Sequence, residues 1–170
     1  MSSRSATLGH VFACCDALYR SLGEGAATLG ADAYVVRLHE MARTFGALAL
    51  ELRRHLDAPA PAPLAIIEQV LTRAIATDPT GTLAVYAMAV VVGPRLLVTL
   101  RDARVAHADD QEFQSLLDEV ARVTLAEIQS LARVGEHGAD TDDPRWRASA
   151  RELVNLLDAS GNAESFVLSR

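Results

Sequence analysis

Leu38-His39-Glu40-Met41-Ala42-Arg43 and, much later in the chain, Leu117-Asp118-Glu119-Val120-Ala121-Arg122 are two versions of one pattern. Each lies in a longer run whose apolar residues recur every three or four positions, which is the spacing of an amphipathic helix. The first run continues to Leu52 and the second to Val134. A helix pair used twice and joined by one long crossover is a known bundle topology. The repeated pattern therefore predicts a four-helix bundle.

Helical periodicity also marks the rest of the chain. An apolar stripe over residues 8–22 predicts the first helix, and a short helix is expected over residues 64–76, after the proline-rich connector 57–63. A long apolar helix is expected over residues 82–106. It should kink at Gly93-Pro94, because Pro94 cannot donate a hydrogen bond to the carbonyl four residues earlier. No run alternates with period two for long enough to predict a sheet.

These segments define one domain. We expect an all-α protein with an up-down four-helix bundle over residues 1–134 and a short helix in the crossover. A linker over residues 135–143 should lead to an extra C-terminal helix and tail, residues 144–170, packed on the same domain. Asp143-Pro144 supports the start of that last helix, since a cap followed by proline at the first helical position is typical there.

The composition excludes several classes of function. The chain has 170 residues, 50% of them hydrophobic, which is enough for one domain with a sizeable core. All 16 basic residues are arginine, so the chain has neither a Schiff-base lysine nor the lysine of a phosphate-binding loop. The net charge of −6 is opposite to the positive surface that a generic nucleic-acid binder requires, so no nucleic-acid partner is expected.

The sequence also predicts a compartment. Cys14 and Cys15 are adjacent, and no distant cysteine exists to form a disulfide with either. The first residues lack the apolar run of a secretory signal, so we expect a cytoplasmic protein. Residues 82–100 are apolar enough to resemble a membrane span, but Gly93-Pro94-Arg95 interrupts them. We expect a buried core helix there and no membrane span.

Glu24-Gly25-Ala26-Ala27, then Phe45, then Glu51-Leu52-Arg53-Arg54-His55-Leu56 carry a resemblance to a known family. In these stretches the chain resembles the small ferritin-like four-helix proteins of bacteria, many of which have an unknown or stress-related role. The proline-rich link, the short helix and the second pair of long helices follow in the order that the resemblance implies. The similarity covers about Thr7 to Val134 and implies a ferritin-like bundle.

Ferritin-like proteins that do chemistry hold two metals between a Glu from each of two helices and an E-x-x-H pair from each of the other two. This sequence has no E-x-x-H. Its nearest matches are Glu40-x-x-Arg43 and Glu119-x-x-Arg122, and arginine has no lone pair to donate to a metal. Residues 85–91 of the long apolar helix also offer no carboxylate. We therefore expect that the di-metal site has been lost and that no cofactor is bound, with iron as the alternative.

Three acids are the candidates if a metal is bound after all. Glu127 lies on an apolar seam, where it is either a residual metal or ligand contact or an edge residue whose carboxylate reaches water. Glu40 and Glu119 lie off their seams, and each is expected to pair with its own arginine three residues later. Cys15 lies on the core stripe and is expected to act as a small hydrophobe.

The helix expected over residues 82–106 is apolar nearly all round, so its second apolar face needs a cover. A homodimer interface including Val91 and Pro94 is the preferred explanation. The C-terminal helix bearing Trp146 could instead fold back over this face. A third possibility is an apolar ligand pocket that opens at the kink and is lined by Tyr86 and Met88.

The leading functional hypothesis is a non-catalytic protein with a degenerate ferritin-like core that acts through self-association or a protein partner. The first alternative is an iron-binding ferritin-like oxidoreductase or storage protein with unconventional ligands, namely Glu40, Glu119 and Glu127. The second alternative is a binder of an apolar small molecule.

Overall fold

The computed structural model describes residues 3–30, 33–135 and 143–159, and within these ranges it contains helices and connecting segments but no strand. The all-α prediction is therefore confirmed. Most of the expected linker, residues 136–142, and the tail, residues 160–170, lie outside the described residues. The elements are α1 (Ser3–Ala26), α2 (Ala33–Arg54), α3 (Ala65–Thr77), α4 (Thr82–Tyr86), the π-helical η1 (Ala87–Val92), α5 (Gly93–Ala106), α6 (Gln111–Gly135) and α7 (Pro144–Ala159).

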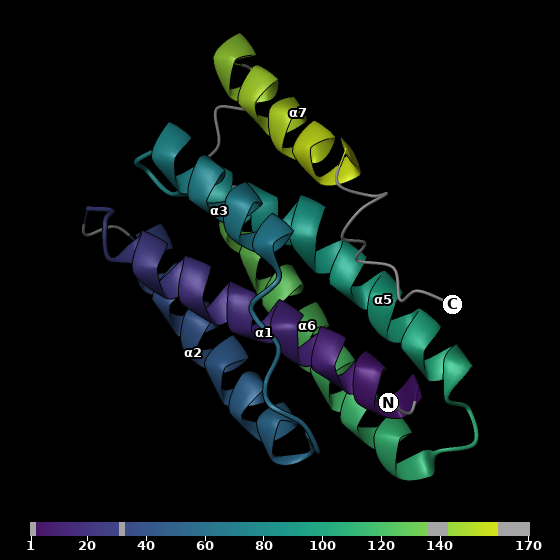
Figure 1. The fold of residues 1–170 in the computed structure, drawn as a ribbon. Helices are drawn as coiled ribbons and strands as arrows, with labels where there is room; N and C mark the ends of the chain where they lie inside the picture. Colours follow the sequence, from purple (N-terminus) through teal and green to yellow (C-terminus); the bar gives the residue numbers. More distant parts are fainter. Residues whose placement is uncertain (1–2, 31–32, 136–142, 160–170) are drawn as a thin grey trace.

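The first two helices form an antiparallel pair that runs side by side along the bundle (Figure 1). Their apolar stripes meet, so that Leu18, Leu38 and Phe45 are completely buried. Gly46 makes room for the ring of Tyr19 against α2, because a Cβ there would lie 2.8 Å from that ring. Burial of one apolar stripe per helix against the other is what holds such a pair together.

The connection after α2 and then α3 run back along the bundle, so α4 begins at the end of the molecule where α2 began (Figure 1). The backbone N–H of Leu64 donates to the carbonyl of Ala13 at 3.2 Å, which fastens this connection to α1. Helix α3 lies between α1 and α7. Its buried residues form a broad apolar face, which comprises Ile66, Ile67, Val70, Leu71, Ala74 and Ile75.

The chain is helical from Thr82 to Ala106, through α4, η1 and α5, and this 82–106 helix pairs with α6. The sequence predicts a kink at Gly93-Pro94, whereas the structure has the π-helical η1 directly before these residues. Pro94 has no N–H, and its ring crowds the carbonyl four residues earlier. In the wider π turn, the N–H of Gly93 donates instead to the carbonyl of Met88, five residues earlier. The π turn thus accommodates the proline within a continuous helix.

The 82–106 helix is the only one among the described helices that is long and apolar enough to cross a membrane by length and composition. In the most apolar 18-residue stretch of this helix, 61% of the residues are buried inside the protein. Such burial is typical of a core helix, which passes the same test of length and composition.

The last helix folds back over the bundle. Helix α7 lies on the outer side of α3 and of the 82–106 helix (Figure 1). It buries Ala150, Leu153 and Leu157, which recur with the spacing of one helix face. The sequence left open whether the C-terminal helix covers the second apolar face of the 82–106 helix. The structure places α7 on part of that face.

Replacing Gly93 with alanine should destabilise the fold, because its Cβ would lie 2.7 Å from the carbonyl oxygen of Met88 and from Cδ1 of Ile128. We expect a loss of about 1–3 kcal/mol, the usual cost of overpacking a core. Gly23→Ala is the matched control, since that Cβ would meet only Ala42 at 3.7 Å and should gain about 0.5–1 kcal/mol of helix propensity. Urea unfolding followed by circular dichroism measures both. Equal stabilities of the two variants would contradict the close approach at Gly93.

Candidate functional site: the Arg37–Glu127 ion pair and the surfaces around it

An arginine and a glutamate from different hairpins meet between α2 and α6. The Arg37 guanidinium donates through Nη2 to Oε2 of Glu127 and through Nη1 to Oε2 of Glu40 at 3.0 Å. The Arg37 side chain is 20% exposed and that of Glu127 is 11% exposed, so the pair is largely removed from water. One guanidinium thus bridges two carboxylates, one of them across the bundle.

This pairing explains how the bundle tolerates a buried glutamate. A carboxylate on an apolar seam must either reach water or find a partner. The structure places Glu127 in the second situation, with Arg37 as the partner. Sequence spacing did not find this partner because Arg37 precedes Glu127 by 90 positions. A signal did exist, since Arg37 directly precedes the apolar Leu38 of the α2 stripe.

The structure corrects one expected ion pair and confirms another. Glu40 pairs with Arg37, three residues before it, and not with Arg43, because the Arg37 side chain is already held in place by Glu127. Glu119 pairs with Arg122 as predicted, through two contacts of 2.5 and 2.9 Å. The hydrogen bond from Arg122 lowers the pKa of the Glu119 carboxyl and raises the pKa of the arginine. Both side chains are exposed, so this pair contributes little to stability.

The geometry around Arg37 favours a structural role. Guanidinium stays protonated throughout the physiological range and offers no lone pair to a metal. Glu40 and Glu127 are brought to this cation, whereas Glu119 lies about 12 Å from Glu127 along α6 by the helical rise and faces water. Across the described ranges, no three His, Cys, Asp or Glu side chains gather as a metal site would require. The three candidate acids therefore do not converge.

A second polar cluster, which sequence spacing did not reveal, joins the start of α1 to the turn between α5 and α6. Thr7 Oγ1 lies 3.0 Å from Nε2 of His107. Arg4 donates to Asp110 at 2.9 Å and lies over the ring of Phe113. Asp110 also accepts from the backbone N–H of Phe113 and so caps α6. These groups are mutually satisfied, and they fasten one end of the bundle.

The two cysteines are free and completely buried. Burial raises the pKa of the Cys14 thiol to about 12. The pKa of Cys15 is raised by burial first, and then by the neighbouring Cys14 and Asp16. Because the thiolate is the nucleophilic form, neither thiol is activated for chemistry.

The residues expected at an interface or ligand pocket lie in different environments. Tyr86 and Trp146 are half-buried and contact each other edge to face, with ring centroids 5.0 Å apart. Met88 and Val91 are buried in the core, and only Pro94 is exposed. Val91 therefore faces the protein interior, because the π turn and α7 set which side of this helix is covered.

At Gly93-Pro94, where an apolar pocket was one of the possibilities, the structure has a close contact between two helices. Gly93 packs against Ile128 of α6 so closely that a Cβ would overlap it. The apolar side chains that the 82–106 helix does expose are Val90 (55%), Val98 (48%) and Val105 (75%).

Removing only one partner of the Arg37–Glu127 pair should lower the free energy of unfolding. Arg37→Met leaves Glu127 buried without a partner, so we expect a loss of about 3 kcal/mol in the free energy of unfolding. Arg37→Met combined with Glu127→Leu removes both charges and should recover most of that loss. Arg122→Met is the control, because it removes the exposed pair with Glu119 and should cost far less than Arg37→Met. A double variant as unstable as Arg37→Met alone, in urea unfolding, would contradict the pairing.

The buried thiols predict how stability depends on pH. Since the pKa of each thiol is higher in the folded chain than the usual 9.0, the unfolded chain loses these protons first as the pH rises past 9. The free energy of unfolding should therefore keep its full value below that pH. Above it, the free energy of unfolding should fall, by about 1 kcal/mol per thiol near pH 10.

The chain has no lysine to titrate over the same range. Cys14→Ala combined with Cys15→Ala should lose clearly less stability than the wild type between neutral pH and about pH 10. Urea unfolding at both pH values measures the two losses. Equal losses would mean that the thiols are not buried as described.

The chain was compared with protein-family models, curated proteins and solved structures. No protein-family model, curated protein or solved structure matches the chain.

Proposed function

We propose that this chain is a non-catalytic ferritin-like bundle protein that acts by pairing with a second copy of itself in the cytoplasm. The order of its elements supports the ferritin-like part of the proposal. Two antiparallel helix pairs, α1 with α2 and the 82–106 helix with α6, are joined by a connection that runs back along the bundle (Figure 1). One long crossover of this kind is the layout of ferritin-like bundles.

The buried polar groups support a role without catalysis. A catalytic centre needs a group whose protonation or lone pair is available to a substrate. The carboxylate of Glu127 is neutralised by Arg37, and the thiols of Cys14 and Cys15 are held protonated by burial. The carboxylate of Glu127 and the two thiols are thus poorly suited to act on a substrate.

The observation that carries self-association is an apolar row on the outside of the 82–106 helix. We call Val90, Pro94, Val98 and Val105 the valine ridge. Their spacings of four, four and seven residues place them near one side of the helix. The three valines are 48–75% exposed, and Pro94 is exposed as well. Exposed apolar side chains that share one side of a helix can mark an interaction surface, and two-fold pairing is the commonest way to cover one.

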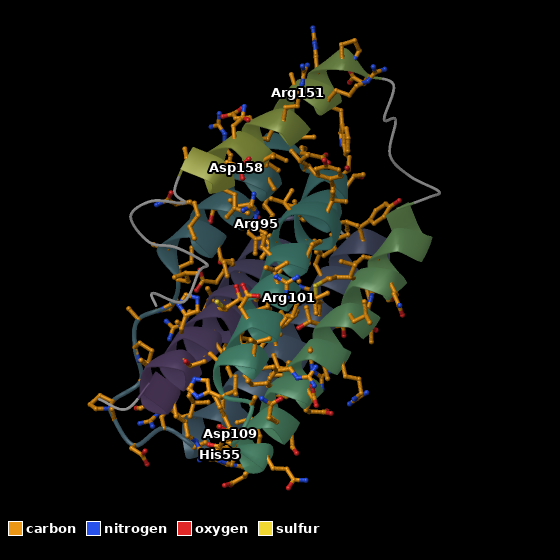
Figure 2. The ribbon with its side chains drawn as sticks, turned by 90° about the vertical axis from the view of Figure 1, so that its right-hand side faces the viewer. His55, Arg95, Arg101, Asp109, Arg151 and Asp158 are labelled. Carbon is orange, nitrogen blue, oxygen red and sulfur yellow. The ribbon has the colours of Figure 1, made fainter. Side chains whose placement is uncertain are left out.

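The charges beside the ridge are compatible with self-pairing. A two-fold contact brings each patch onto its own copy, so unpaired like charges would repel. The three arginines of α5 each have a carboxylate already: Arg95 pairs with Asp158, Arg101 with Asp102, and Arg104 with Asp118. Figure 2 shows Arg95 and Arg101 along this side of the molecule, with Asp158 at the near end of α7. The ridge is therefore bordered by neutralised charges.

A charge in the middle of the ridge should separate the copies. Val98→Asp places a carboxylate at the centre of the proposed contact, and we expect a monomer at concentrations where the wild type is a dimer in sedimentation equilibrium. Val98 is 48% exposed, so the fold should survive, whereas Val91→Asp would place the charge in the core.

Val36→Asp is the matched control, because Val36 is 59% exposed but belongs to α2. It should dimerise as the wild type does. A monomeric wild type, or a dimer that Val98→Asp leaves intact, would overturn the proposed function.

A further inference from the structure

The valine ridge extends through both parts of the 82–106 helix because of the π turn between them. In a regular α-helix, Val91 would share a side with Pro94 and Val98, which lie three and seven residues after it. In the structure, however, Val91 is 4% exposed and Val90 is 55% exposed. The wider turn of η1 rotates the residues before Pro94 relative to those after it. Val90 thereby joins the side that carries Val98 and Val105.

The resulting row has nearly the same spacing when it is followed from either end. Val90 lies eight residues before Val98, and Val105 lies seven residues after it. If two such helices pack antiparallel about Val98, Val90 of one copy lies within about one residue of Val105 of the other. Each valine of the ridge then meets a valine of the second copy. An antiparallel contact therefore covers the ridge along its whole length.

Helix α7 lies beside only the first part of the ridge. It packs on α3, α4 and η1, and Asp158 near its end pairs with Arg95 near the start of α5. Beyond this point, α5 continues past the end of α7 (Figure 1). In a parallel pair, the α7 helices of both copies would lie at the same end of the contact and crowd each other. In an antiparallel pair, they lie at opposite ends, each near the part of α5 that the other copy's α7 does not flank.

The charged side chains along the ridge fit the same arrangement. Arg95 and Asp102 lie seven residues apart and thus on one flank of the ridge, whereas Arg101 lies on the other flank. Antiparallel packing about Val98 brings Asp102 of one copy to about the level of Arg95 of the other. The side chain of Asp102 is 50% exposed, so it can reach across the contact. A guanidinium has donors for two carboxylates, so Arg95 can bind this acid and keep Asp158.

We propose that two copies of this chain pair through antiparallel 82–106 helices, with Val98 close to the two-fold axis and Val90 of each copy packed against Val105 of the other. This inference rests on the proposed self-association and adds the direction and register of the contact. It also gives the π turn a role in recognition, because the turn places Val90, and not Val91, on the ridge.

Chemical cross-linking between cysteines placed on the ridge tests the direction of pairing. In the antiparallel pair, the two copies of position 90 lie about 20 Å or more apart along the helices, and so do the two copies of position 105. Val90→Cys alone and Val105→Cys alone should therefore stay unlinked with a short bismaleimide. The two variants should link to each other once their subunits have been mixed and allowed to exchange.

Two further variants calibrate this experiment. Val98→Cys should link by itself, because position 98 lies near the two-fold axis in this arrangement. Val36→Cys is the matched control, since Val36 is an exposed valine of α2 and should stay unlinked both alone and mixed with Val105→Cys. The native thiols of Cys14 and Cys15 should not react, because both side chains are completely buried.

The outcomes separate the two proposals. If sedimentation shows a dimer in which Val90→Cys alone and Val105→Cys alone each link, the helices are parallel. The antiparallel direction is then wrong, and self-association through the valine ridge stands. If sedimentation shows a dimer in which none of the ridge variants links, alone or mixed, the contact lies elsewhere and both proposals fail. A monomeric wild type likewise overturns both.

Discussion

Burial of the 82–106 helix is the constraint on which the rest of this molecule depends. Most of its circumference is apolar, so neighbours must cover it on several sides. Helix α6 packs along one side, and α3 with α7 covers another. The π turn before Pro94 keeps the helix continuous, and the close contact of Gly93 with Ile128 brings α6 against it. The apolar side chains of this helix that remain exposed are those of the valine ridge.

The contact of Glu127 with Arg37 shows how a carboxylate is accommodated between two helices of this core. Glu127 could remain in the apolar seam only with a partner, and the partner is a cation that holds its charge at any ordinary pH. A metal would supply positive charge in the same way but would also bring chemistry. Arg37 supplies the charge alone. The pair joins α2 to α6, and its net contribution to stability is small because burying two charges costs free energy that their attraction must first offset.

Local patterns predicted much of the fold. The apolar stripes placed the helices, the prolines of residues 57–63 placed the crossover, and Asp143-Pro144 placed the start of α7. Interactions within one helix were also accessible: Glu119 pairs with Arg122 because residues three apart share a face. Glu40 shows the limit of this reasoning. Two arginines lie within its reach on α2, and the choice between them depends on Glu127, which belongs to another helix.

The sequence by itself determined the helical class, the approximate helix boundaries and the lack of lysine chemistry, because these depend on residue type and short-range spacing. Only the tertiary structure decided that Val91 faces inward while Val98 faces water, that Glu127 meets Arg37, and that α7 covers α3. The physical reason is the same in each case. An all-round apolar helix has no intrinsic inner side, and a charge has no intrinsic partner, until helices distant in sequence pack against it.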